Sequence, residues 1–246
     1  MTPGMHFFDA RLKIGRADQH IREATALVDG LPDSYKPTVT VHEYDGPLLT
    51  HELPDPEGTK QTLGLIAGDA MHNLRSALDY AWIGALAKLE ITPSNRSKFP
   101  VVGTLNDLEN LLGKENVPTD SGLHDCMLHK IKAYEDGNEF LWALHKLNNS
   151  DKHKLVLPIE FYASINNFEV RRIATGEVIK GGSWGMKTEG KFEFPFHKSE
   201  EVHDPGKMGI SVMIGEGMPL KSMDVHECLQ VFSHVVVLIV NQLEAI

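Results

Sequence analysis

The chain changes character at about Asn149, and that change limits the folds open to it. Before Asn149, apolar residues recur at helical spacing from Met5 to about Leu31, from about Thr59 to Leu89 and from about Gly122 to Leu147. After it come short β-rich segments separated by Gly, Asn or Pro, and a last helical pattern runs from about Met223 to Leu243. Helices followed by strands and a closing helix predict an α+β protein.

Shorter sequence patterns predict further elements of the fold. Asp45-Gly46, inside the strand-like segment 35–54, predicts a β-hairpin, and LNDLENLLG predicts a short helix. The β-rich segments predict one antiparallel sheet of four or five strands, and the glycine-rich segment 181–194 predicts a mobile hairpin loop with Trp184 at its tip. We expect one domain over residues 1–246, with a helical part over about 1–150 and the sheet plus terminal helix over about 151–246.

The amino-acid composition argues against several classes of protein. The 246 residues are 41% hydrophobic and 24% charged, with a formal charge of −10, which argues against a broad nucleic-acid-binding surface but leaves room for a local basic pocket. Cys126 and Cys228 lack metal-type spacing and predict buried thiols in a reducing compartment. The N-terminus lacks the apolar run of a signal peptide, and the most apolar run, 231–240, is shorter than the ~20 residues of a membrane span. We therefore expect a cytoplasmic protein with no membrane partner.

The segment GDAMHNLRSALDYAW (68–82) places an unusual set of side chains on a helix. On a helical wheel its short or planar polar residues fall on one arc roughly 160° wide, and none of them is Lys or Glu. Leu65 precedes this arc, and Ile83 and Leu86 follow it, which predicts a polar island on an otherwise buried face. Arg75 and Asp79 are spaced to pair with each other. The island comprises Asp69, His72, Asn73, Arg75, Ser76 and Asp79.

A second polar segment, LHKLNNSDKHKLVLPI (144–159), is the most basic part of the chain. Its Asn-Asn-Ser-Asp sequence predicts a short loop over 148–154, and docking of that loop on the island would bring imidazoles and cations together beside carboxylates. Such a group of side chains suits anion binding and metal-independent acid–base chemistry. We therefore expect an anionic small molecule or RNA as ligand. The predicted catalytic residues are His153, His72 and Asp151, and the predicted ligand-binding residues are Arg75, Lys152, Asn73, Ser76, Asp79 and Asn149.

These two motifs also carry a resemblance. GDAMHNLRSALDYA, FPV and LNNSDKHKLVLPI resemble a family from bacteria and their phages that has a G-D-x-x-H-N-L-R-S-A-L-D helix and a later D-K-H motif. The first motif is also similar to the signature of HEPN ribonucleases, in which an Arg is followed four to six residues later by a His on one helix. That resemblance implies RNA cleavage without metal, but Tyr80 stands where the His would be expected, so His153 or His72 would have to replace it.

Two other interpretations stay open. Arg75, Asp79, Asp151 and His153 can instead form a structural network in a binding or interaction protein, such as a phage or host-defence component, and a homodimer is compatible with either interpretation. Asp69, His72, Asp151 and His153 can also supply metal ligands, but the cations Arg75 and Lys152 would oppose a metal ion. We therefore expect no metal and no cofactor, and the chain has no P-loop, G-x-G-x-x-G or G-x-S-x-G motif.

Overall fold

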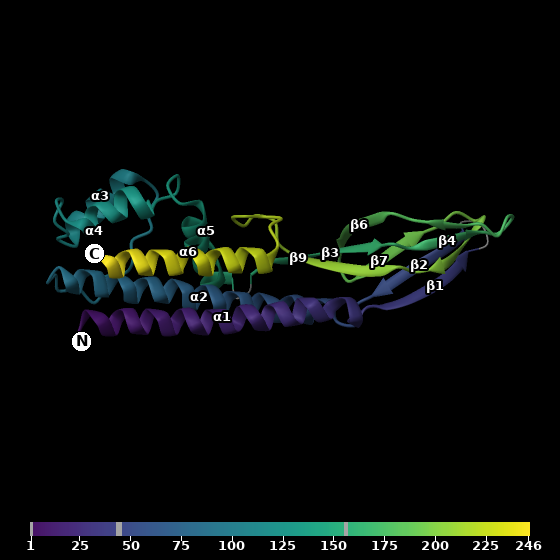
Figure 1. Ribbon diagram of the computed structural model, residues 1–246, viewed down its shortest axis with the longest axis horizontal. Coiled ribbons are helices and arrows are strands. Elements are labelled where there is room, and N and C mark those ends of the chain that lie inside the picture. The colour runs from purple at the N-terminus through teal and green to yellow at the C-terminus, as the bar shows by residue number, and fades with distance from the viewer. Residues whose placement is uncertain (1, 43–45, 155–156) are drawn as a thin grey trace.

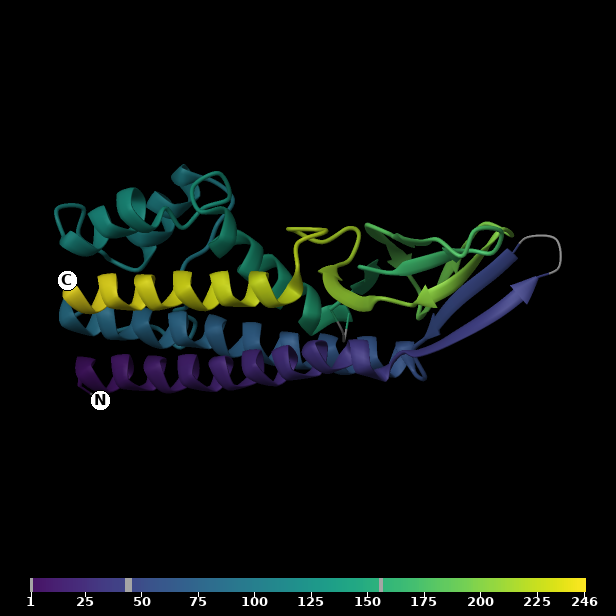
Figure 2. The ribbon, with the colours of Figure 1, turned by 45° about the vertical axis from the view of Figure 1, so that its right-hand side comes forward.

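The computed structural model describes the whole chain except residues 1, 43–45 and 155–156, and the side chains of residues 36, 41–42 and 150–154. The molecule is elongated, with a helical bundle at one end and β-strands at the other (Figures 1 and 2). Both chain termini lie at the helical end. The α+β class that the sequence predicts is confirmed.

Three long helices form the bundle: α1 (Pro3–Ser34), α2 (Pro56–Lys88) and α6 (Val225–Ala245). Helix α2 starts at a side-chain cap, because the Asp55 carboxylate accepts a hydrogen bond from the Gly58 amide at 3.0 Å. Its predicted apolar arc is buried, with Ala67, Leu74 and Leu78 each 0% exposed. The first helix, expected to end at about Leu31, continues through Pro32 to Ser34.

A smaller helical layer covers one side of the bundle (Figure 2). It consists of α3 (Leu105–Lys114), α4 (Gly122–Asp125), the π-helical turn η1 (Cys126–Ile131) and α5 (Glu139–Lys154). The predicted short helix at LNDLENLLG is α3. Helix α5 runs through residues 148–154, so the loop predicted there is wrong. Cys126 and Cys228 are free and buried, as predicted.

The strands of the described residues form three antiparallel sheets of three strands each, instead of one sheet of four or five. The predicted hairpin is β1 (Lys36–His42) and β2 (Gly46–Glu52), which pairs with β7 (Lys191–Pro195); its turn, at 43–45, lies outside the described residues. The second sheet has the order β6 (Ser183–Thr188), β3 (Ile159–Asn166) and β9 (Lys207–Ile214). The third has the order β5 (Val178–Lys180), β4 (Glu169–Arg172) and β8 (Glu200–Asp204).

The second and third sheets are two halves of one creased sheet. Asn166 pairs with Lys207 and Glu169 with Asp204 in the same register, and the register then shifts between Glu169 and Val170. Gly206 lies in the crease with φ +76, and a Cβ on it would sit 2.6 Å from the Asn166 carbonyl oxygen. Only glycine fits that backbone conformation without strain.

Two hydrophobic cores stabilise these parts. The larger core fills the helical end, and a smaller one lies among the strands. The smaller core comprises Leu49, Ala163, Ile165, Val170, Phe192, Phe194 and Phe196. Trp184, predicted at the tip of a mobile loop, belongs to β6 and packs edge-on against Phe194 with ring centroids 4.1 Å apart.

Helix α6 is long and apolar enough to cross a membrane, judged by length and composition alone. In this molecule it packs against α1, α2 and α5, and 39% of its most apolar segment is buried. Leu238 on its outer face is 47% exposed, so the helix is less enclosed than its composition predicts.

Candidate functional site

Arg75 and Asp79 hold a backbone segment in place. Arg75 Nη1 donates to Asp79 Oδ1 at 2.6 Å, and Arg75 Nη2 donates to the Phe99 carbonyl oxygen at 2.6 Å. The Phe99 amide in turn donates to Asp79 Oδ1 at 2.9 Å, so the pair satisfies both backbone groups of one residue. The ring of Phe99 then packs edge-on against Trp82, with centroids 6.3 Å apart. The predicted Arg75–Asp79 pair therefore exists, and it anchors the segment before Pro100.

Burial of Arg75 and its pairing with Asp79 have opposite effects on the pKa of the guanidinium. The side chain is only 7% exposed, and this burial lowers the pKa of the guanidinium, whereas the Asp79 charge and hydrogen bond act to raise it. Arginine stays charged even so, because its ordinary pKa lies far above neutrality. The guanidinium is thus a buried, paired cation, and a ligand would have to compete with Phe99 and Asp79 for its donors.

Of the other residues of the polar island, Asp69 and His72 face solvent, Ser76 is half-buried and Asn73 is buried. Leu65, one turn before Asp69, is 55% exposed. The prediction that apolar burial encloses the island is therefore wrong on its N-terminal side. The exposed face of α2 forms a strip between α1 on one side and the Phe99 segment on the other.

A hollow of about 330 Å³ lies along this strip, between α1 and α2. Asn73 lies at its wall: its Oδ1 accepts from Lys13 Nζ at 3.3 Å, and its Nδ2 donates to the Asp69 carbonyl oxygen at 2.8 Å. Asn73 is 9% exposed, so it offers the Lys13 ammonium a buried acceptor. The residues lining this α1–α2 hollow are Asp9, Leu12, Lys13, Arg16, Asn73 and Tyr80.

A second, smaller hollow adjoins the first. It measures about 270 Å³ and is lined by Ser76, Asp79, Tyr80 and Ile83. Tyr80 is 39% exposed and lines both hollows. Three predicted ligand-binding residues, Asn73, Ser76 and Asp79, therefore line adjoining hollows on one helix face.

The α1–α2 hollow holds two cations that lack carboxylate partners. Among the described side chains, neither Lys13 nor Arg16 forms an ion pair; Arg16 donates only to the side-chain oxygen of Gln19, at 2.8 Å. Asp9 is the one carboxylate in the lining. The hollow thus offers an ammonium, a guanidinium, an amide and a phenol, which suit an anionic ligand.

The sequence did not point to Lys13 and Arg16. They lie on one side of a helix that the apolar pattern predicts, but nothing in that pattern says which later helix packs beside it. Asn73 is 60 residues from Lys13 in the chain, and only the packing of α1 against α2 brings them together.

The predicted site residues of the 148–154 segment belong to helix α5 and not to a loop. Asn149 lies on α5, where its Nδ2 is 3.0 Å from His145 Nε2. The backbone of Asp151, Lys152 and His153 belongs to the last turn of the same helix, but their side chains lie outside the described part of the structure. Their convergence with His72 and Arg75 therefore stays a prediction.

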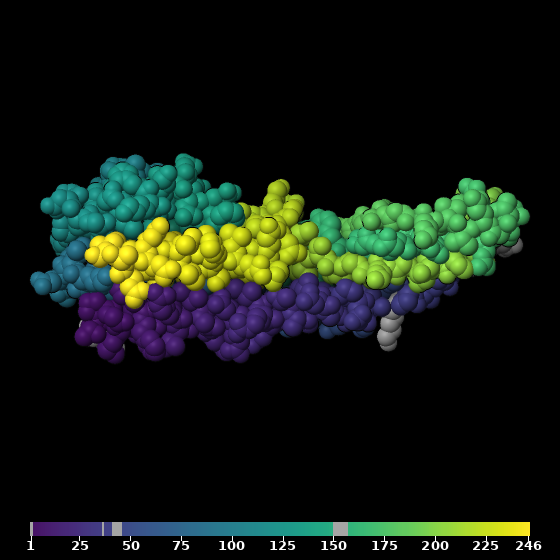
Figure 3. Space-filling model, in the orientation of Figure 1, coloured from purple at the N-terminus to yellow at the C-terminus, as the bar shows by residue number. Residues whose placement is uncertain are grey.

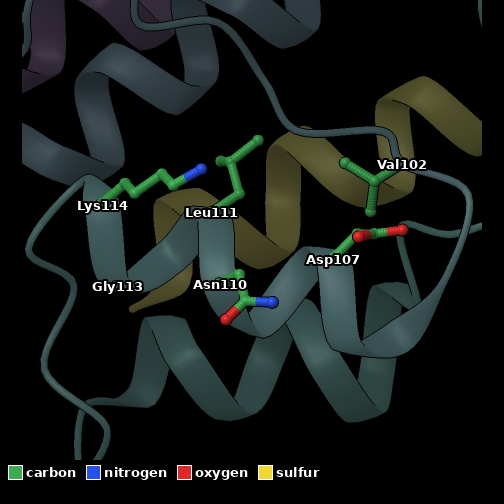
Figure 4. A pocket seen from close by; sticks show the side chains of 6 residues that line it. All are labelled: Val102, Asp107, Asn110, Leu111, Gly113 and Lys114. Atoms are coloured by element: carbon green, nitrogen blue, oxygen red, sulfur yellow. The ribbon is translucent and has the colours of Figure 1, made fainter.

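A hollow of about 620 Å³ beside α3 offers a weaker site (Figure 4). Five of its six lining residues come from α3 alone, and Val102 supplies the sixth. Its Asp107 carboxylate already accepts a hydrogen bond from the Thr104 hydroxyl at 2.7 Å as part of the helix cap. No group of three or more His, Cys, Asp or Glu side chains suited to a metal ion occurs in the described part of the chain.

No family of known proteins, no characterised protein and no solved structure matches this chain. The resemblances to the bacterial and phage family and to the HEPN signature therefore stay predictions.

Proposed function

We propose that the α1–α2 hollow binds a phosphate-bearing or other anionic ligand. The observation that carries this proposal is the pair of cations, Lys13 and Arg16, that share one hollow and have no carboxylate partner among the described side chains. Asn73 supports it by accepting a hydrogen bond from the Lys13 ammonium at 3.3 Å. A charge-assisted hydrogen bond to a phosphate oxygen is among the stronger polar contacts that a protein makes.

RNA is the ligand class that this lining favours. Tyr80 is 39% exposed beside the two cations, and an exposed aromatic ring can stack on a nucleobase while the cations bind a phosphate. The net charge of −10 would repel a long polyanion over most of the surface. A short single-stranded segment or one nucleotide therefore suits the hollow better than a duplex.

Acid–base chemistry on that ligand is the second part of the proposal. His72 is the predicted catalytic residue whose side chain the structure describes, and it is exposed on α2 next in sequence to Asn73. An imidazole titrates near neutral pH and can transfer a proton. RNA cleavage without a metal would assign His72 this role, with His153 and Asp151 as further candidates.

A binding or interaction protein without catalysis is the alternative. One observation favours it: Arg75 and Asp79 use their hydrogen bonds on the backbone of Phe99, which is what a structural network does. A short-RNA binding assay joined to a cleavage assay separates the two proposals. Binding without cleavage, unchanged in His72→Ala, would favour the non-catalytic protein.

The variant Lys13→Met tests the binding proposal. We expect it to weaken binding of a fluorescent single-stranded RNA by about 10- to 100-fold, since a hydrogen bond to a charged group contributes about 1.5–3 kcal/mol. Arg22→Met, on the same helix and outside this hollow, is the matched control and should bind as the natural protein does. Equal affinities of the two variants would contradict the proposal.

A further inference from the structure

The outer face of α1 exposes large apolar side chains. Met5 is 50% exposed, Phe8 62% and Leu12 58%, and their spacing places them on one face of the helix. Figures 1 and 2 place α1 at the outside of the bundle with α2 on its inner side, and Figure 3 shows α1 forming one long edge of the surface. A contiguous apolar patch of this kind marks an interaction site. We name Met5, Phe8, Leu12 and Gly15 the α1 stripe.

Gly15 continues this stripe without a side chain. It lies in the interior of α1, where glycine weakens a helix, and a Cβ built on it would meet no atom within 4 Å. Nothing within the described chain therefore requires a glycine there. Because Gly15 has no side chain, the row of exposed side chains has a gap next to Leu12, and we refer to this gap as the depression.

The stripe is complementary to itself. Phe8 and Gly15 are two helical turns apart, so they lie on the same side of the stripe. When a second α1 packs antiparallel on the first with Leu12 at the centre, Phe8 of each copy lies over Gly15 of the other. The bulkiest exposed side chain of one copy then fills the depression of the other, twice by symmetry.

The charged residues beside the stripe are also complementary to themselves. Asp9 and Arg16 are also two turns apart and lie together on the opposite side of the stripe, where both line the α1–α2 hollow. The same antiparallel arrangement brings Asp9 of each copy to Arg16 of the other. Neither residue has an ion-pair partner within the described part of its own chain.

We infer that the α1 stripe binds a second copy of this chain, with the two α1 helices antiparallel and centred at Leu12. A two-fold dimer uses the same patch on both subunits, and such a patch must be complementary to itself in shape and in charge. A partner of one charge sign would match Arg16 or Asp9 but not both. The dimer would place the two α1–α2 hollows side by side, although it does not depend on ligand binding.

Three large apolar side chains per copy make a small interface, so the dimer is expected to be weak. Interfaces below the standard size of about 800 Å² per partner are those of transient complexes, and a dissociation constant in the micromolar range suits this one. Sedimentation velocity of the ligand-free protein from about 1 μM to about 1 mM covers that range. The expected result is a shift from monomer to dimer as concentration rises.

Two sets of variants test the geometry. Gly15→Leu fills the depression and should weaken the dimer about tenfold or more through overpacking, whereas Gly113→Leu, at an exposed helical glycine of α3 with equal open space, should not. Asp9→Arg and Arg16→Asp should each weaken the dimer, and the double variant should restore it. Restoration by the second charge change is the mark of reciprocal pairing between two copies.

Three results would overturn the inference: a monomer over the whole concentration range, a dimer that tolerates Gly15→Leu, or two weakening charge changes that do not rescue each other. These measurements use no ligand, and Lys13→Met leaves the α1 stripe intact. Failure of the dimer and failure of anion binding are therefore distinguishable.

Discussion

At Arg75 the chain buries a full positive charge, and its surroundings explain how the fold tolerates it. Asp79 supplies the countercharge and the Phe99 carbonyl oxygen takes a second donor, so the guanidinium is paired in a low-dielectric setting. The side chain of Asp79 is 34% exposed, whereas that of Arg75 is 9% exposed, so the carboxylate is less buried than the guanidinium. Loss of Asp79 strands a buried cation, whereas loss of Arg75 leaves a carboxylate that water can reach.

Removal of either partner should therefore destabilise the fold by different amounts. We expect Asp79→Ala to lower the free energy of unfolding by about 3 kcal/mol or more, and Arg75→Met to lower it by less. Arg171→Met, which breaks an exposed pair with Glu201, should cost less than about 1 kcal/mol and serves as the control. Urea denaturation measures all three. A stability of Arg75→Met equal to that of the control, together with lost ligand binding, would instead assign Arg75 to the ligand.

His51 gives a second prediction at this scale. Its imidazole is 5% exposed on β2, neither ring nitrogen has a hydrogen-bond partner in the described structure, and burial lowers its pKa. The fold therefore holds the neutral ring, while the unfolded chain takes up a proton below its ordinary pKa of about 6.5. This contribution to stability is complete above about pH 6.5 and is lost as the pH falls towards the folded pKa.

The variant His51→Leu removes that titration. We expect the natural protein to lose more stability between about pH 7.5 and about pH 5.5 than the variant does, since the unfolded variant has no ring at this position to protonate. Denaturation curves at both pH values measure the difference, and the remaining histidines cancel in the comparison. An identical loss in both proteins would show that His51 is not held neutral by the fold.

At the scale of elements, the long helices were predictable and the end of α5 was not. The apolar arc of α2 repeats over many turns, so its existence and buried side follow from the sequence. Asn-Asn-Ser-Asp predicts a turn from local preference, but the helix continues there because Leu144, Leu147 and Asn148 are buried against the bundle. Tertiary packing outweighs local propensity in such a segment.

The strands were predictable in part. The β-rich segments after Asn149 contain β3, β4, β5, β7 and β9. The strands β6 and β8 were missed, because glycines hide the first and charged residues the second. The crease at Gly206 depends on the pairing of distant strands and so leaves no local pattern to read.

The candidate site was predictable in part. Asn73, Ser76 and Asp79 line the hollows because their spacing on α2 fixes a common face. Lys13 and Arg16 could not be assigned, since periodicity shows which side of α1 is buried but not which helix it meets. The cations expected from residues 150–154 belong to side chains that lie outside the described structure.

At the scale of the whole molecule, the α1–α2 hollow and the α1 stripe lie at the helical end, far from the creased sheet (Figure 1). One helix therefore presents an anion site on one side and a self-complementary face on its outside. The strands contribute no residue to either surface. The two surfaces share Arg16, so a dimer that pairs Arg16 with Asp9 of the second copy leaves Lys13 as the unpaired cation of each hollow.

Chemical-shift mapping of the ¹⁵N-labelled protein with a short single-stranded RNA tests the proposed site most directly. Because the ligand is expected to contact the cations of α1 and the exposed face of α2, the amides of residues 9–16 and 73–80 should shift together and saturably. Inorganic phosphate should shift the amides near Lys13 and Arg16 while leaving those beside the Tyr80 ring nearly unchanged. Shifts confined to the end of α5 or to the strands, or no shifts at all, would contradict the site.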